Sequence, residues 1–186
     1  MIIRNSSWFL RLWGRYFKFL GKPKEAPLPS VGRLADIAAP AMLISQAIGR
    51  VGDIINGEHV ATLTSLPWGV IYSHVSSPSN IQHGLAASHP AVVYEMMWDL
   101  AVLGMIWPLR NRLRPYGMVF ALYLALYAAG KFVVSFLRVA DLPTDTFMDK
   151  EWVWSMGEAH FISLAILSIT IPLLLIKAQV VRPRAP

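Results

Sequence analysis

Long uncharged stretches separated by clusters of charge constrain this chain more than any other feature of its sequence. Four apolar runs stand out, and few charged side chains interrupt them: Leu34–Gly49, Pro90–Leu109, Tyr116–Leu137 and Phe161–Ile176. A helix needs about 20 apolar residues to cross the hydrocarbon core of a bilayer. The second and third runs reach that length, and the other two reach it with small or interfacial neighbours. We therefore expect an all-α integral membrane protein with about four transmembrane helices.

The composition supports this class. Hydrophobic residues make up 55% of the chain and charged residues 15%, whereas soluble domains hold roughly 45–50% and about 25%. The chain has no cysteine, which excludes disulfides, thiolate metal sites, a cysteine nucleophile and a lipidated cysteine of its own. The formal net charge of +6 fits either nucleic acid or a membrane surface, and the position of the charges decides between them.

Most of the 17 Lys and Arg residues lie in three places, which are residues 1–33, the turn 110–114 and the tail 177–184. The segment 141–158, in contrast, is rich in acidic side chains. Basic and non-basic connections thus alternate along the four runs. The positive-inside rule then puts both termini and the turn in the cytoplasm and the other connections outside. Because topology explains the basic charge, we expect no nucleic-acid partner.

The organisation follows from these assignments. Residues 1–30 form a basic leader, in which Trp8 to Leu20 is expected to be an amphipathic helix lying on the membrane surface; a poorly ordered leader is the alternative. Residues 31–186 are expected to be a single transmembrane domain. Its extracytoplasmic loop, about 53–89, has strand-like pieces between turn residues and predicts a small β-rich flap.

Ionisable side chains inside a span are costly and by default mark function. Glu95, Asp99 and Lys131 interrupt the second and third runs. These runs form an antiparallel hairpin, and at about 1.5 Å of rise per residue Asp99 and Lys131 each lie about 10 Å below the outer end. We expect these two side chains to form an ion pair. The alternatives are that helix rotation gives each another partner, or that the pair is purely structural.

The segment Gln46–Thr64 is the densest in polar chemistry. Arg50, Asn56 and Glu58 stand at the expected water–lipid boundary among several glycines. An arginine there suits a phosphate, because its planar fork can bind two oxygens. This suggests a phospholipid headgroup site, with a solvated helix end as the alternative. The histidines of the outer section lack zinc-like spacing, so we expect no metal or other cofactor and read them as surface or hydrogen-bonding residues.

Several blocks of residues, in order, resemble the bacterial prolipoprotein diacylglyceryl transferase family. Residues 49–61 read G-R-V-G-D-I-I-N-G-E-H-V-A, against the family's approximate G-R-x-G-N-F-x-N-G-E-x-x-G. Residues 66–68 match its L-P-W, and residues 89–95 read H-P-A-V-V-Y-E against its H-P-S-Q-L-Y-E. Two later blocks, at 127–138 and 155–158, resemble Y-G-x-x-R-x-x-x-E-x-x-R and S-M-G-Q.

The resemblance covers about residues 33–178 and implies a function. The family consists of polytopic enzymes of the bacterial cytoplasmic (inner) membrane that move the diacylglyceryl group of phosphatidylglycerol to a prolipoprotein cysteine, while glycerol phosphate leaves. By resemblance, the substrate-binding residues are Arg50, Asn56, Gly57, Tyr94, Glu95, Asp99 and Arg138. By the same resemblance, the catalytic residues are His89, Glu58 and Lys131.

The departures from the family pattern predict an N-terminally shortened, degenerate member. The family's early spans and their H-G-G-L segment, with its histidine, are not matched. Asp53 replaces the signature asparagine and places an anion where phosphate should bind. Lys131 replaces an arginine and loses the bidentate fork, while Ser135 replaces a glutamate.

Three functions remain open. We favour a lipid-binding membrane subunit with weakened or lost catalysis, whose partners are a phosphatidylglycerol-like phospholipid and other membrane protein subunits. The alternative is an active phosphatidylglycerol–prolipoprotein diacylglyceryl transferase of lipoprotein maturation. The third is an altered transferase with another lipid or acceptor, and an upstream start encoding the missing segment would restore the active enzyme.

The topology can be tested directly because the chain has no cysteine of its own. A Ser76→Cys variant should react with a membrane-impermeant maleimide in intact cells, because the loop around it is expected to face outside. An Asn111→Cys variant should react only after lysis, because its turn is basic and expected to be cytoplasmic. Labelling of Asn111→Cys in intact cells would reverse the assigned orientation.

Overall fold

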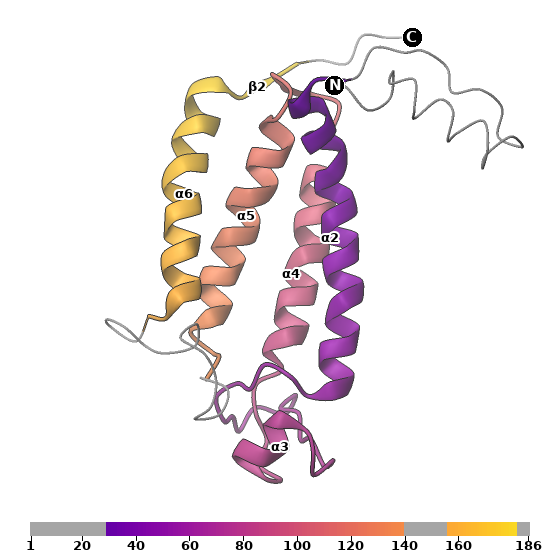
Figure 1. The fold of residues 1–186 in the computed structure, drawn as a ribbon, viewed down its shortest axis with the longest axis vertical. Helices are drawn as coiled ribbons and strands as arrows, with labels where there is room; N and C mark the ends of the chain where they lie inside the picture. The colour runs from indigo at the N-terminus through magenta and orange to yellow at the C-terminus, as the bar shows by residue number, and fades with distance from the viewer. Residues whose placement is uncertain (1–28, 140–155, 182–186) are drawn as a thin grey trace, which may run out of the picture. The chain divides into compact units, whose positions relative to one another are not determined.

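The computed structural model describes residues 29–139 and 156–181, and residues from Val31 onward form one compact unit. Within these residues four long helices run side by side (Figure 1): α2 (Val31–Asn56), α4 (Ala91–Ile106), α5 (Met118–Ser135) and α6 (Glu158–Lys177). Helix α5 packs against α4 and α6, and α2 packs against α4 and α5. The expected all-α class is confirmed, while the leader helix expected over Trp8 to Leu20 lies outside the described residues.

Three of the described helices, α2, α5 and α6, are long and apolar enough to cross a membrane. Helix α4 has 16 residues and is shorter than a full span of about 20. Pro108 follows its C-cap, Trp107, and cannot continue the helix, because proline lacks the backbone N–H. The expected bundle therefore consists of three candidate spans and one shorter helix packed between α2 and α5.

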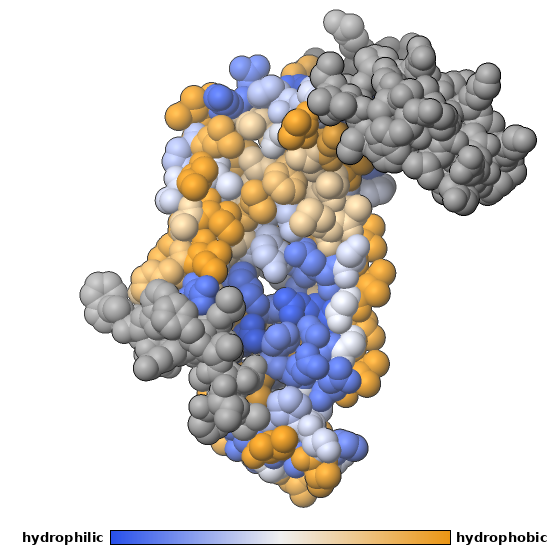
Figure 2. Space-filling view, in the orientation of Figure 1, coloured by the Kyte–Doolittle hydropathy of each residue, from blue (hydrophilic) through white to orange (hydrophobic). Residues whose placement is uncertain are grey.

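The outer faces of α2 and α6 carry large apolar side chains that no other described element covers. On α2 they include Leu34, Ile37, Ile44, Ile48, Val51 and Ile55, and on α6 they include Ile162, Leu164, Ile169, Leu175 and Ile176. Figure 2 shows these apolar surfaces beside a compact hydrophilic area. In water such surfaces would drive association, whereas in a bilayer they face a solvent as apolar as themselves. They identify a membrane protein.

One end of the bundle, here called the hairpin end, is closed by the connection between α4 and α5. Strand β1 (Leu113–Arg114) in this connection pairs antiparallel with β2 (Gln179–Val180), which follows α6. Asp36 of α2 accepts hydrogen bonds from the backbone N–H groups of Gly117, at 2.8 Å, and Phe120, at 3.0 Å. These are among the N–H groups that the start of α5 would otherwise leave unsatisfied. The carboxylate therefore ties α2 to α5.

The other end of the bundle, the loop end, carries residues 57–90. The expected β-rich flap is wrong, because the loop contains one short helix, α3 (Pro78–His83), and isolated bridges instead of paired strands. Most of its backbone hydrogen bonds lie within the loop, and two tie it to the residues that follow α5. The N–H of Thr62 donates to Leu137 O at 2.8 Å, and the N–H of Val139 donates to Val60 O at 3.0 Å. These bonds fasten the loop to the end of α5.

The packing of α4 against α5 depends on Gly130. A Cβ atom there would collide with the indole of Trp98, whose Nε1 donates to the carbonyl of Leu126 at 2.8 Å. We expect Gly130→Ala to lower the free energy of unfolding by about 1–3 kcal/mol, the usual cost of overpacking. Thermal or denaturant unfolding in detergent measures this.

The matched control is Gly104→Ala in α4, where a Cβ meets nothing within 4 Å. There the change is expected to be neutral or stabilising by up to about 1 kcal/mol, because alanine favours a helix over glycine. Equal losses at the two positions would contradict the account of the α4–α5 contact.

Candidate functional site

The site begins where α2 ends. The backbone N–H groups of Gly57 and Glu58 both donate to Asp53 O, at 3.0 and 3.2 Å, and close the helix. Gly57 has φ +69°, and a Cβ there would collide with Ser77 Oγ and the ring of Tyr72. Only glycine fits both conditions without strain. The chain therefore reverses at this point and brings the next residues back over the last turn of α2.

A buried carboxylate from α4 holds two cations from the neighbouring helices. Glu95 is 6% exposed. Its Oε1 lies 2.7 Å from Lys131 Nζ on α5, and its Oε2 lies 2.5 Å from Arg50 Nη2 on α2. The other guanidinium nitrogen, Nη1, lies 3.1 Å from Asp53 Oδ2. Charges at this depth are tolerated only when they are paired, and these pairs join three helices.

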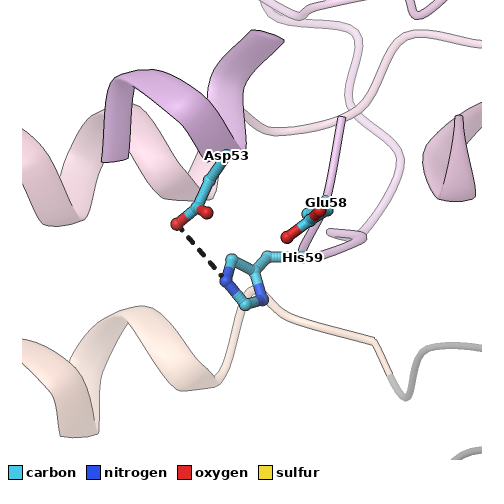
Figure 3. A group of neighbouring side chains, drawn as sticks. All are labelled: Asp53, Glu58 and His59. Atoms are coloured by element: carbon cyan, nitrogen blue, oxygen red, sulfur yellow. Dashed lines mark ion pairs between the residues drawn. The ribbon is translucent and has the colours of Figure 1, made fainter. Parts of the chain in front are cut away.

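His59 continues this arrangement toward the loop. Its Nδ1 lies 2.5 Å from Arg138 Nη2, and its Nε2 lies 3.4 Å from Asp53 Oδ2 (Figure 3). Because a guanidinium can only donate, Nδ1 accepts and the ring proton lies on Nε2, facing Asp53. Burial lowers the pKa of His59, and the positive charge of Arg138 lowers it further. The ring is therefore neutral at pH 7.

Asp53, Glu58 and His59 form the one group of described residues whose ligand atoms lie close enough to hold a metal ion, within 4.8 Å of one another (Figure 3). Their other contacts argue against a metal here. The His59 nitrogen that faces Asp53 carries the proton, and the other nitrogen accepts from Arg138. The Asp53 carboxylate also neutralises Arg50. The donor set is satisfied as a hydrogen-bond chain and fits a cation poorly.

These contacts define one unit, here called the loop-end network, made of Arg50, Asp53, His59, Glu95, Lys131 and Arg138. It contains three cations and two carboxylates, and His59 is neutral. Among the described residues, Arg138 has no carboxylate partner within ion-pair distance. The network therefore has one excess positive charge, at its loop side. Figure 2 shows a hydrophilic area on the face of the bundle toward this end.

The expected ion pair between Asp99 and Lys131 is wrong. Lys131 binds Glu95, which lies one turn nearer the loop end than Asp99 and also faces Arg50. Asp99 is 2% exposed, and its Oδ2 has no hydrogen-bond partner among the described residues. Asp99 and Lys131 line a common cavity of about 10 Å³, which is enough for roughly one water molecule.

The remaining binding and catalytic candidates surround the network. Asn56 Nδ2 donates to Glu58 Oε1 at 3.2 Å, and both side chains are exposed. Tyr94 OH accepts from Trp68 Nε1 at 2.8 Å and lies 3.4 Å from His89 Nδ1. Trp68 belongs to the L-P-W block, so this contact joins two of the sequence blocks that are far apart along the chain.

The three residues with implied catalytic roles do not meet in one pocket. Lys131 belongs to the loop-end network, whereas Glu58 and His89 line a small pocket between the loop and α4. His59 lines that same pocket and touches the network from the other side.

His59 has a place in the site that the sequence alone did not predict. Its contacts fit the reading of the outer histidines as surface or hydrogen-bonding residues, and so does that of His83, whose Nε2 lies 2.9 Å from Ala61 O. The signal for His59 is its place two residues after Gly57. Since glycine marks the helix end and the reversal, the following side chains return to the last helical turn. His59 itself has φ 60°, a conformation that is uncommon outside glycine and gathers at functional sites.

The fold and the site define a class of protein. It is a helical membrane protein in which a buried ion-pair network joins three helices at one end, beside a polar loop. A sequence model described as prolipoprotein diacylglyceryl transferase matches residues 24–176. The chain belongs to this family.

Individual relatives agree with the family assignment. The chain is 35% identical over 119 residues to "Phosphatidylglycerol--prolipoprotein diacylglyceryl transferase 2" of Streptomyces coelicolor, covering 63% of this chain and 36% of the relative. It is 38% identical over 117 residues to the Corynebacterium diphtheriae transferase, covering 58% and 41%. It is 29% identical over 150 residues to the Dehalococcoides mccartyi transferase, covering 81% and 53%. The chain thus spans between about a third and a half of these relatives' lengths.

The lowered pKa of His59 predicts a pH dependence. The unfolded chain has a histidine pKa near 6.5 and the folded chain a lower one, so below about 6.5 the unfolded state binds more protons. The stability contribution of the neutral ring is therefore complete above that pH and is lost as the pH falls toward the folded pKa. Unfolding midpoints measured between pH 8 and pH 5 should decline below about 6.5.

His59→Gln should flatten this part of the decline. The matched control is His74→Gln, whose histidine is exposed in the same loop and whose replacement should leave the slope as in the wild type. If the slope persisted in His59→Gln, a different group would be titrating.

Proposed function

We propose that the loop-end network binds the phosphate of a phosphatidylglycerol-like headgroup and belongs to the diacylglyceryl-transfer chemistry of the family. One observation supports this proposal most directly. Arg138 is a cation that contacts neutral His59 and has no carboxylate partner among the described residues. Arginine binds phosphate through two parallel hydrogen bonds. The loop end, with this charge, would lie at the outer face of the bacterial inner membrane.

Arg50 adds to this site under a constraint. Both of its terminal nitrogens face carboxylates, Asp53 and Glu95, so a phosphate would have to share the guanidinium with them. Asp53 stands where the family signature has an asparagine, and its negative charge opposes an incoming phosphate. We therefore propose headgroup binding through Arg138 first, with transfer weaker than the same site would support with a neutral residue at 53.

An active transferase is the second candidate, and the orientation of His59 favours it. When a phosphate draws Arg138 away, Nδ1 becomes a free base, while Asp53 accepts from Nε2 and stabilises the protonated ring. His59 would take the proton of the acceptor thiol, and the thiolate would attack the diacylglyceryl carbon. A C–S bond forms as the C–O bond to phosphate breaks. The bonding electrons pass to glycerol phosphate, where Arg138 and Arg50 offset the charge.

The subunit role expected from the sequence would need a protein covering an apolar face. The exposed faces of α2 and α6 suit lipid equally well. Identification of co-purifying chains after gentle solubilisation is the measurement that bears on this role.

Asp53→Asn separates the two candidates. If Asp53 chiefly repels phosphate, the variant should bind phosphatidylglycerol several-fold more tightly, since one negative charge beside Arg50 is gone. If Asp53 chiefly supports His59 as a base, the variant should lose transfer to a lipobox peptide by at least tenfold, the usual scale of general-base support. Lipid titration and transfer of labelled diacylglycerol measure the two effects separately.

Arg138→Gln tests the binding proposal itself. It should weaken phosphatidylglycerol binding at the loop end, measured by labelling of that end with a photoreactive lipid, by at least tenfold, because a charged hydrogen-bond donor at the phosphate is lost. Arg112→Gln, an exposed arginine at the hairpin end, is the matched control and should bind as the wild type does. Unchanged binding in Arg138→Gln would remove the headgroup site from the loop end.

A further inference from the structure

The hairpin end of the bundle carries a second basic pocket, at the opposite end of α2 from the loop-end network. This hairpin-end pocket has a volume of about 410 Å³, within the range of pockets that hold small molecules. Its lining includes three arginines and two aromatic residues, which are Arg33, Arg110, Arg114, Trp107 and Tyr116.

The aromatic rings hold the guanidinium groups in place. Arg110 Cζ lies 3.8 Å from the centre of the Trp107 ring, and Arg114 Cζ lies 4.2 Å from that of Tyr116. Arg33 Cζ approaches the same Tyr116 ring at 5.8 Å. Stacking over a ring uses the flat face of a guanidinium and leaves the N–H groups at its edge able to donate. The arginines are therefore ordered before a ligand arrives.

The charge of the pocket is not neutralised from within. Of the residues that line it in the described part of the chain, Asp36 is the acidic one, and both its oxygens accept from the start of α5. No acidic side chain of residues 29–139 or 156–181 lies within ion-pair distance of Arg110 or Arg114. Arg110 and Arg114 thus bring to the lining two positive charges that no acidic side chain of these residues pairs.

The surroundings of the pocket indicate the kind of anion. Ile37, which lines it, is 61% exposed on the apolar face of α2, so the pocket opens beside a surface that suits acyl chains. Trp107 and Tyr116 belong to the residue types that concentrate at the membrane–water interface. Basic pockets between membrane helices bind anionic lipid headgroups. We propose that the hairpin-end pocket binds the phosphate of an anionic phospholipid, independently of the loop-end network.

A photoreactive phosphatidylglycerol, with the reactive group on its headgroup, tests this in the full chain reconstituted in phosphatidylcholine nanodiscs. Labelled peptides are mapped by mass spectrometry. The wild type should be labelled within residues 107–116, and the double variant Arg110→Gln/Arg114→Gln should need at least tenfold more lipid for the same labelling there, since two charged hydrogen-bond donors to the phosphate are lost from the lining. Arg112→Gln, which lies in the same turn but outside the lining, should be labelled as the wild type is.

Two further measurements complete the test, which are labelling at the loop end and competition by glycerol phosphate. Labelling at the loop end should be unchanged in the double variant, which shows that the protein is folded and that the two sites are separate. Glycerol phosphate at the same concentration should not displace the lipid. Absence of label within residues 107–116, an equal loss in Arg112→Gln, or displacement by glycerol phosphate would each overturn the assignment.

Discussion

The interaction on which the rest of the structure depends is the buried carboxylate of Glu95 between Arg50 and Lys131. An unpaired carboxylate at 6% exposure in a membrane bundle is prohibitively costly. Removing one partner from a buried pair costs about 3–5 kcal/mol, because the charge left behind has no compensation. Glu95 therefore requires α2 and α5 to lie on either side of α4 in one register. That register in turn decides which side chains reach the loop.

The loop end is a site because of what happens beyond this pair. Gly57 reverses the chain, and the bonds between residues 60–62 and 137–139 bring His59 against Arg138. Asp53 then binds both Arg50 and His59. A single carboxylate thus connects the structural ion pairs of the helices to the hydrogen-bond chain of the loop. The negative charge of Asp53 therefore lies at the centre of the network.

The helices and the family could be predicted from the sequence. So could the need of Glu95 and Lys131 for partners, because charges inside apolar runs are few and must be satisfied. The partner of Lys131 could not. Glu95 and Asp99 lie one turn apart on α4, and counting residues from the helix ends favoured Asp99. Lys131 pairs with Glu95 because the rotation of the helices turns Glu95 toward it and because Glu95 is also attracted by Arg50. The loop was also misread, since its strand-like residues bond to the end of α5 and form single bridges.

Apolar runs, charge asymmetry and motif order by themselves determined an all-α membrane protein of the prolipoprotein diacylglyceryl transferase family. These properties depend on local composition and spacing, which can be read from the sequence without knowing which residues touch. Tertiary structure alone decided that His59 is neutral and bound by Arg138, that Asp99 is left beside a small cavity, and that three arginines meet at the hairpin end. Each of these depends on which faces of distant segments meet. The energy of an ion pair or hydrogen bond falls steeply within a few ångströms. The spacing of residues along the sequence does not predict the rotation of a helix about its axis to that accuracy.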